Sequence, residues 1–151
     1  MVPWNKVLVV CSAGGHMKEA LSAMGRSASG FHLATYRTGE CRAINSRYVL
    51  HYLTNPHLSK LKYLKNFVQS FFLLLRVHPK VIITTGAGLA IPTALLGKML
   101  GVKLIVVDTM ALVDKLSKTG EFLYRYADLF VVQWPELLEK YPKAIYGGLS
   151  L

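Results

Sequence analysis

Short runs of branched apolar residues alternate along this chain with segments of helical character, and this alternation restricts the possible folds most. Several runs are continuously apolar, which is typical of parallel strands that are buried on both faces. Periodicity predicts strands at residues 6–10, 31–35, 48–53, 81–84, 103–107, 129–133 and 144–146. It predicts helices at residues 16–24, 60–77, 91–100, 119–126 and 136–140. The pattern therefore predicts an α/β fold with one Rossmann-like, doubly wound, mostly parallel sheet.

No linker or low-complexity stretch divides these elements, and 151 residues suit one domain. We therefore expect residues 1–151 to form a single Rossmann-like domain. Charged residues make up 17% of the chain and hydrophobic residues 52%, which excludes a disordered chain. The two cysteines, Cys11 and Cys41, exclude a disulfide scaffold and a cysteine-rich zinc site.

Basic residues outnumber acidic residues by 18 to 8, which gives a formal charge of +10. The imbalance is local, because no acidic residue occurs between Cys41 and Val107 while lysines and arginines recur there. A field of this sign attracts phosphate groups in nucleic acid, in an anionic membrane or in a phosphorylated ligand. Charge alone does not choose among these partners.

Two glycine-containing loops follow the first and fourth predicted strands, and each loop leads into a helix. Their candidate binding residues are Ser12, Gly14, Gly15, Thr85, Gly86 and Gly88. In the usual Rossmann order these two strands are neighbours at the topological switch point, so both loops open on one crevice. Helix N-termini with free amides bind phosphate, and two facing loops suit a diphosphate. The alternative is that the glycines only make tight turns between strand and helix.

The letters of these loops do not match the common nucleotide motifs. Residues 11–16 are not G-x-G-x-x-G, no acidic residue ends the second strand, and no G-x-x-x-x-G-K-[ST] loop occurs. A dinucleotide enzyme or a nucleoside triphosphatase is therefore not expected, and we expect no cofactor. The spacing of histidines and cysteines also indicates no metal site.

His16 directly follows the first glycine pair, and Asp108 follows the fifth predicted strand. Both residues are therefore expected at the crevice. A neutral imidazole can take a proton from a sugar hydroxyl near neutral pH, so His16 is the first candidate for a general base. Asp108 is the alternative base or the group that orients His16. The structural alternatives are a phosphate ligand or turn cap for His16 and a helix N-cap for Asp108.

The remaining histidines lack the spacing of metal ligands and are expected to be structural. They are His32, His51, His57 and His78.

The predicted helix at residues 60–77 combines lysines at its start with large apolar side chains. Its apolar stripe consists of Leu61, Leu64, Val68, Phe71 and Leu75. Such a helix can pack on the sheet or lie in an anionic membrane interface, and the extra Leu73 and Leu74, beyond what one buried stripe needs, favour membrane or partner contact. The predicted membrane-contacting residues are Lys60, Lys62, Lys65, Phe71, Phe72 and Leu74. The apolar stretches are too short or too interrupted to predict a transmembrane helix.

Several of these residues match a known family. The sequence Ser12-Ala13-Gly14-Gly15-His16 resembles the S-x-G-G-H loop of the acceptor-side half of split GT-B glycosyltransferases. The match includes Gln69-Ser70 and residues 84–88, and it is closest from residue 128 to residue 148, which contain Gln133-Trp134-Pro135-Glu136-Leu137. The chain resembles the membrane-associated subunit of the eukaryotic dolichol-linked chitobiose-forming N-acetylglucosaminyltransferase. It equally resembles the bacterial exopolysaccharide and capsule proteins of that family.

The resemblance implies an acceptor-binding half-enzyme that recruits a second, donor-binding glycosyltransferase subunit. The two subunits would transfer a sugar from a UDP-sugar donor to a polyprenyl-diphosphate-linked acceptor, with inversion and without a bound metal. The glycine loops would then hold the acceptor diphosphate, and we expect the chain at the cytoplasmic face of a membrane surface as a peripheral protein. Partner contacts are expected at Trp134, Pro135, Tyr146, Gly147 and Gly148.

Two features depart from the family pattern. Family members typically have Glu-Ser followed shortly by Arg, whereas this chain has Asp108-Thr109 and then Leu112, which lacks a guanidinium. Eukaryotic members carry an N-terminal membrane helix that is not seen in this sequence, so we expect peripheral attachment. The rival interpretation is a non-catalytic basic α/β module for anionic membrane or nucleic acid, or a membrane scaffold for a partner enzyme. It leaves His16 and the facing loops without a purpose, so we expect no nucleic-acid partner.

Overall fold

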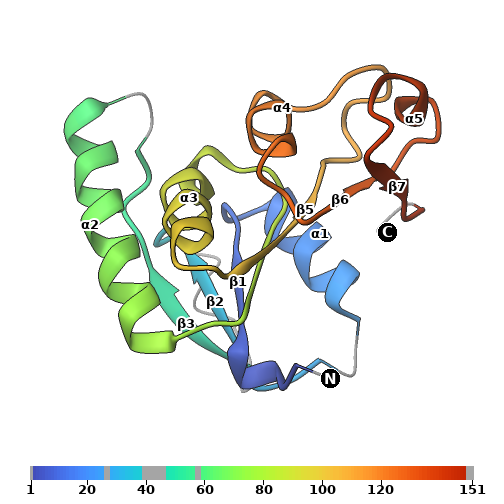
Figure 1. The fold of residues 1–151 in the computed structure, drawn as a ribbon. Helices are drawn as coiled ribbons and strands as arrows, with labels where there is room; N and C mark the ends of the chain where they lie inside the picture. The colour runs from blue at the N-terminus through green and yellow to red at the C-terminus, as the bar shows by residue number, and fades with distance from the viewer. Residues whose placement is uncertain (1, 26–27, 39–46, 57–58, 149–151) are drawn as a thin grey trace.

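A computed structural model describes residues 2–25, 28–38, 47–56 and 59–148 of the chain. They form one seven-stranded sheet in the order β3-β2-β1-β4-β5-β6-β7, and each neighbouring pair of strands is parallel (Figure 1). The chain order reverses between β1 and β4, as in doubly wound sheets. The predicted Rossmann-like α/β fold is therefore confirmed.

Every predicted strand and helix is present, with ends that differ by no more than one or two residues. The strands are β1 (Val7–Val10), β2 (Phe31–Thr35), β3 (Tyr48–Tyr52), β4 (Val81–Thr84), β5 (Lys103–Val107), β6 (Leu129–Val132) and β7 (Ala144–Tyr146). The helices are α1 (Gly15–Met24), α2 (Lys60–Val77), α3 (Ile91–Met99), α4 (Lys118–Tyr124) and α5 (Leu137–Lys140). Short 3-10 turns, η1 (Trp4–Lys6) and η3 (Gly88–Ala90), precede β1 and α3.

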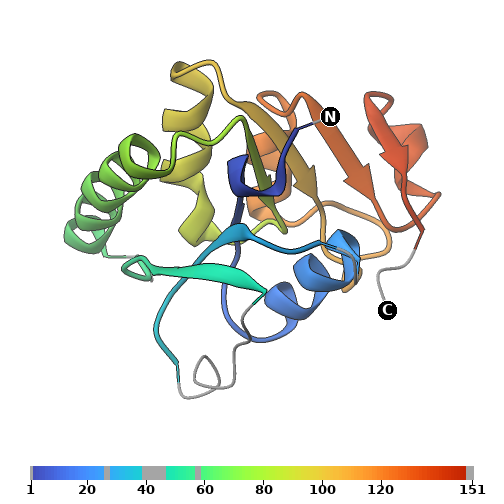
Figure 2. The ribbon, with the colours of Figure 1, turned by 90° about the horizontal axis from the view of Figure 1, so that it is seen from below.

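The core lies in two layers, one on each face of the sheet. Because successive strand residues point to opposite faces, Leu8 and Val10 of β1 join one layer while Val7 and Val9 join the other. The first layer includes residues of α2, α3, α4 and α5, whereas the second is covered by α1 (Figure 2). Among the described elements α1 is the one helix on that second face, so the face is less completely covered over β5, β6 and β7.

Helix α2 turns a different side to the core from the one that its apolar stripe indicates. Its buried residues are Asn66, Ser70, Leu73, Leu74 and Val77. The stripe is exposed instead, with exposed fractions of 80% at Leu61, 62% at Leu64 and 63% at the neighbouring Phe72. The prediction of Leu74 as a membrane-contacting residue is therefore wrong, because only 2% of it is exposed.

Buried polar partners explain this orientation of α2. Asn66 Nδ2 donates hydrogen bonds to the carbonyl oxygens of Thr54, at 2.8 Å, and Leu89, at 3.3 Å. Ser70 Oγ donates to Asn66 Oδ1 at 3.0 Å and lies 2.8 Å from Thr93 Oγ1 on α3. A buried polar group is tolerated when its hydrogen bonds are made, so these two residues face the interior while large apolar residues remain outside.

Within the described part of the chain, no helix is both long and apolar enough to cross a membrane.

Candidate functional site

The two glycine loops meet because β1 and β4 are neighbours. Val10 pairs with Thr84 at the carboxyl ends of these strands, and beyond them Thr85 Oγ1 donates a hydrogen bond to the His16 carbonyl oxygen at 3.0 Å. An open crevice of about 480 Å³ lies there. It is lined by Ser12, His16, Tyr36, Asn55, Pro56, Tyr63, Gly86, Ala87, Gly88 and Leu89. The predicted placement of both loops on one crevice is confirmed.

Not every predicted diphosphate-binding residue lines this crevice. Thr85 is buried behind it, where its hydroxyl ties the second loop to α1. Gly14 and Gly15 form the turn into α1, and the Gly14 carbonyl oxygen accepts hydrogen bonds from the Met17 and Lys18 amides at 3.1 Å each. The sequence does not indicate Tyr36, Asn55 or Tyr63 as site residues. They come close to the two loops only because β2, β3 and α2 fold around the crevice.

Two of the loop glycines are required by backbone conformation. Gly14 has a φ of 90° and Gly86 a φ of 81°, a region that side chains disfavour. At Gly86 an added Cβ would also lie 3.1 Å from Ser117 Oγ and 3.3 Å from Asp108 Oδ1. Gly86 therefore lets the second loop pass close to the β5–α4 connection.

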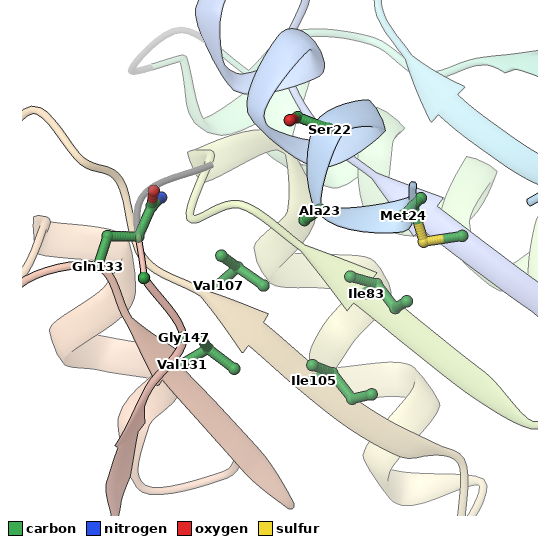
Figure 3. A pocket seen from close by; sticks show the side chains of 10 residues that line it. Ser22, Ala23, Met24, Ile83, Ile105, Val107, Val131, Gln133 and Gly147 are labelled. Atoms are coloured by element: carbon green, nitrogen blue, oxygen red, sulfur yellow. The ribbon is translucent and has the colours of Figure 1, made fainter. Parts of the chain in front are cut away.

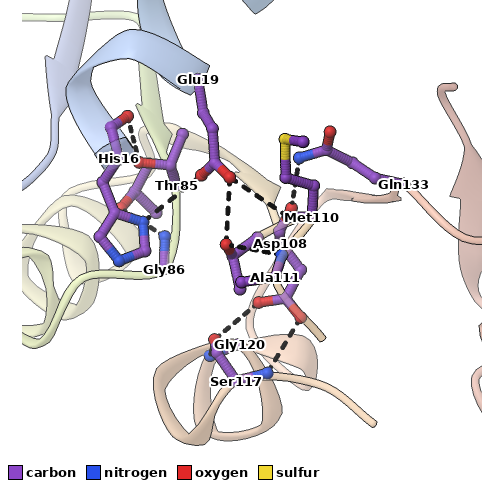
Figure 4. A network of polar contacts seen from close by, with 12 residues as sticks. His16, Glu19, Thr85, Gly86, Asp108, Met110, Ala111, Ser117, Gly120 and Gln133 are labelled. Carbon is purple, nitrogen blue, oxygen red and sulfur yellow. Dashed lines mark hydrogen bonds and ion pairs between the residues drawn. The ribbon is translucent and has the colours of Figure 1, made fainter. Parts of the chain in front are cut away.

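His16 lies at the start of α1, where its half-buried side chain lines the crevice. Its Nδ1 atom faces Glu19 Oε2 at 3.5 Å (Figure 4). The two residues are three positions apart on α1, so their side chains lie on the same side of the helix. The structure therefore places a carboxylate directly beside the candidate base.

Glu19 is a buried carboxylate, with 9% of the residue exposed. Its Oε1 atom accepts hydrogen bonds from Thr109 Oγ1 at 3.1 Å and from the Met110 amide at 3.3 Å. The strand-end pattern does not point to Glu19. The signal that the sequence offers is a carboxylate three residues after His16 on a predicted helix.

Asp108 lies at the end of β5, but its side chain serves the start of α4 (Figure 4). Asp108 Oδ1 accepts from Ser117 Oγ at 2.6 Å and Oδ2 accepts from the Ser117 amide at 3.0 Å. Burial raises the pKa of Asp108, and the hydrogen bonds from Ser117 oppose that shift. The residue that caps α4 is Ser117, whose Oγ accepts from the Gly120 amide at 2.9 Å.

This arrangement corrects two interpretations of Asp108. It is not the N-cap of the following helix, because Ser117 has that position. Nor is it the group that orients His16, because Glu19 lies beside the imidazole and both Asp108 oxygens accept from Ser117. Asp108 instead anchors the loop that leads from β5 to α4.

The other described histidines have structural surroundings. His32 Nδ1 and His51 Nε2 lie 2.8 Å apart on neighbouring strands. Burial is the largest cause that lowers the pKa of both, and the charge of Arg76 adds to it. His78 ends α2 in the left-handed conformation with a φ of 47°. His57 lies outside the described residues, and across the described residues no cluster of His, Cys, Asp and Glu could hold a metal ion.

A second hollow, of about 430 Å³, lies on the sheet face that α1 leaves open (Figure 3). It is lined by Ser22, Ala23, Met24, Ile83, Ile105, Val107, Val131, Gln133, Gly147 and Gly148. Of the predicted partner-binding residues, Gly147 and Gly148 therefore line a depression and Tyr146 and Pro135 are exposed. Trp134 is half-buried, and its indole Nε1 donates to the Met110 carbonyl oxygen at 2.8 Å.

Solved structures with a similar fold include MurG of Acinetobacter baumannii, which is 18% identical with a TM-score of 0.71. They also include a UDP-GlcNAc 2-epimerase of Methanocaldococcus jannaschii, which is 12% identical with a TM-score of 0.68. The matches cover 87% and 93% of this chain but only 42% and 44% of those proteins. This chain therefore spans less than half of each, and at such identities the likeness concerns the fold alone.

The family model described as "Oligosaccharide biosynthesis protein Alg14 like" matches residues 41–150. The protein named UDP-N-acetylglucosamine transferase subunit ALG14 in Homo sapiens is 31% identical, over 94% of this chain and 81% of that protein. The protein of the same name in Mus musculus is 29% identical, over 95% of this chain and 82% of that protein. Because the family model matches most of this chain and these relatives align with nearly all of it, the chain belongs to the Alg14-like family of oligosaccharide biosynthesis proteins.

Proposed function

We propose that residues 1–151 form the acceptor-binding domain of a two-subunit inverting glycosyltransferase. The reaction transfers a sugar from a UDP-sugar to a polyprenyl-diphosphate-linked saccharide. The observation that carries this proposal is the crevice at the β1–β4 switch point, where both glycine loops and His16 meet. The human and mouse relatives are named as subunits of a UDP-N-acetylglucosamine transferase, which supports N-acetylglucosamine as the sugar and a second subunit as the partner.

The acceptor diphosphate binds between the two loops. Helix α1 begins at Gly15 and the 3-10 turn η3 begins at Gly88, so both loops end at the first turn of a helical segment. The N-terminus of a helix carries partial positive charge and amides that lack helical partners, which favour a phosphate there. Gly88 lines the crevice, and its missing side chain leaves room for the ligand to approach the backbone.

His16 is the general base. The acceptor hydroxyl oxygen forms a bond to the anomeric carbon of the donor sugar as the bond from that carbon to the UDP phosphate oxygen breaks. UDP leaves with the electron pair, and the hydroxyl proton passes to the imidazole of His16. A single displacement of this kind inverts the configuration at the anomeric carbon. General-base catalysis of this type is worth about 10²–10⁴-fold in rate.

The chain attaches peripherally to the cytoplasmic face of a membrane through α2. Its exposed surface combines Lys60, Lys62 and Lys65 with the exposed apolar residues Leu61, Leu64, Phe67, Val68, Phe71, Phe72 and Leu75. A basic and apolar helix face of this kind binds at the interface of anionic lipids, which are enriched in the cytoplasmic leaflet. This surface supports the membrane assignment, whereas the buried Leu74 has no part in it.

The donor-binding subunit docks on the open sheet face beside the chain's C-terminal segment. Val131 pairs with Ile145 in the register of β6 and β7, so Ile145 extends the apolar row that lines the second hollow. Ile145 is 48% exposed. An apolar sheet face of this kind is normally covered, and a partner subunit supplies the cover.

We expect Ile145→Glu to abolish co-purification of the two subunits, because it places a charge in the apolar contact. Lys143→Glu, a charge change at an exposed position just before β7, is the matched control and is expected to leave the complex intact. Equal recovery of the complex with both variants would place the partner elsewhere on the chain.

The function is tested by radiolabelled transfer from a panel of UDP-sugars to lipid-diphosphate acceptors in membranes. The assay compares this chain alone, the donor-binding subunit alone, and both co-expressed. We expect transfer only when both are present, and UDP-N-acetylglucosamine as the active donor. Transfer by this chain alone would contradict the half-enzyme. A stable complex at the membrane without transfer from any donor would favour the non-catalytic scaffold.

A further inference from the structure

We propose that Glu19 is the positioning residue of His16, and that it holds the imidazole with its proton on Nδ1 and a free electron pair on Nε2. This inference rests on the proposed function, in which His16 is the general base. It assigns a task to the Oε2 atom of a buried carboxylate, because only the Oε1 atom joins α1 to the loop after β5.

Two buried polar atoms face each other here without other partners. Within the described residues, neither His16 Nδ1 nor Glu19 Oε2 makes a hydrogen bond, and the two atoms lie 3.5 Å apart. This distance is somewhat longer than a hydrogen bond, which spans about 2.7–3.2 Å. Leaving a buried polar atom unpaired is unfavourable, so a small closure that joins these two atoms is favoured. Each atom is therefore the natural partner of the other.

The carboxylate is fixed from its other side. Glu19 Oε1 accepts from Thr109 Oγ1 and from the Met110 amide, both in the loop that follows β5. These two donors hold the carboxylate group between α1 and that loop, and they leave Oε2 directed at the imidazole (Figure 4). The position of Oε2 is thus fixed both by helix α1 and by the loop after β5, so it holds the imidazole ring in a defined orientation.

The chemistry of a carboxylate determines the tautomer. An ionised carboxylate only accepts hydrogen bonds, so Nδ1 must carry the proton and Nε2 must carry the electron pair. Among the described residues none bonds to Nε2, and His16 lines the crevice. Nε2 is therefore the ring nitrogen available to a substrate hydroxyl. Once it has taken the proton, the nearby negative charge of Glu19 stabilises the imidazolium, as the carboxylate does in serine hydrolase triads.

The alternative is that Glu19 only clips α1 to the loop after β5. The two possibilities predict different tautomers of His16 in the variant Glu19→Gln. Because the Met110 amide can only donate, the glutamine oxygen stays beside it and the glutamine NH₂ group faces His16 Nδ1. The ring then accepts at Nδ1 and carries its proton on Nε2, the wrong tautomer for a base that faces the crevice.

Two measurements on the folded protein test the proposal. The first is ¹⁵N NMR of labelled histidine side chains, which distinguishes the two tautomers without any substrate. We expect His16 to be protonated on Nδ1 in the wild type and on Nε2 in Glu19→Gln. The second is transfer kinetics with the donor-binding subunit, where we expect kcat to fall by about 10²–10⁴-fold with little change in KM for the donor.

The variant Thr109→Val distinguishes the effect of Glu19 on the His16 ring from its contact with the loop after β5. It removes one of the two donors to Glu19 Oε1 but keeps the carboxylate charge, so the Nδ1 tautomer of His16 should remain. A wild-type ring with its proton on Nε2, or the same tautomer in Glu19→Gln as in the wild type, would overturn the proposal. Absence of transfer by the wild type with every donor would instead count against the proposed function, while the NMR result would still decide the role of Glu19.

Discussion

Replacing His16 by alanine is expected to lower kcat for sugar transfer by about 10²–10⁴-fold, because the acceptor hydroxyl then has no base in the crevice. In the proposed function the other subunit binds the UDP-sugar, so KM for this donor should change little. The fold should persist, because the His16 side chain is half-buried and lines an open crevice rather than the core. Transfer kinetics of the two-subunit complex, with circular dichroism of the variant, measure these outcomes.

His78→Asn is a matched control for this experiment. His78 is an exposed histidine at the C-terminal end of α2, and asparagine tolerates its left-handed backbone conformation. Its variant should transfer sugar at the wild-type rate. Near-normal turnover by the His16→Ala complex would exclude His16 as the base and would require a base from the donor-binding subunit or from the acceptor itself.

The arrangement of the sheet follows closely from the sequence. Runs such as residues 7–10 and 104–107 are apolar throughout and bounded by polar or loop residues, so few alternatives to a buried parallel strand exist. The position of the crevice also follows, because strand order places the loops after β1 and β4 together. The first inference rests on the pattern of apolar residues in this sequence, and the second rests on the strand order that is usual for Rossmann-like folds.

The direction in which individual side chains point is much harder to predict from the sequence. Asp108 lies at the carboxyl end of β5 as predicted, yet its two oxygens accept from Ser117, nine residues further on. Glu19, on the first turns of α1, is the carboxylate that reaches His16. Strand order brings both residues to the same edge of the sheet, but loop geometry decides which carboxylate faces the imidazole.

The sequence leaves the orientation of helix α2 open for a related reason. The apolar pattern alone does not decide whether the stripe of Leu61, Leu64 and Val68 packs on the sheet or faces outward, whereas the structure buries Asn66 and Ser70. The pattern weighs each residue by its own polarity and does not include the hydrogen-bond partners that Thr54, Leu89 and Thr93 supply. Once those partners are counted, the polar residues can be buried at little cost, and the apolar stripe is left for an external surface.

The triple variant Leu61→Ser, Leu64→Ser and Phe72→Ser is expected to weaken binding to anionic vesicles by about 10²–10³-fold. Each of these exposed side chains contributes roughly 1–1.5 kcal/mol when the lipid interface covers it. Stability should be nearly unchanged, because all three residues lie outside the core. Vesicle co-sedimentation and thermal unfolding measure the two effects.

A matched control removes exposed apolar surface elsewhere, at Met99, Leu100 and Val113, which are 81%, 54% and 44% exposed. Serine at these three positions should leave vesicle binding unchanged. Equal loss of binding in both triple variants would indicate unspecific adhesion and would contradict a membrane face on α2.

The proposed membrane face of α2 also bears on the proposed catalysis, because Tyr63 of the same helix lines the crevice that holds His16. In this proposal a membrane that touches α2 brings a lipid-linked acceptor close to His16. The α2 triple variant should raise KM for a long-chain acceptor embedded in vesicles while kcat stays the same. A water-soluble short-chain acceptor gains nothing from attachment, so its KM should not change. An equal loss with both acceptors would mean that the substitutions damage the crevice itself, and the link between attachment and acceptor capture would fail.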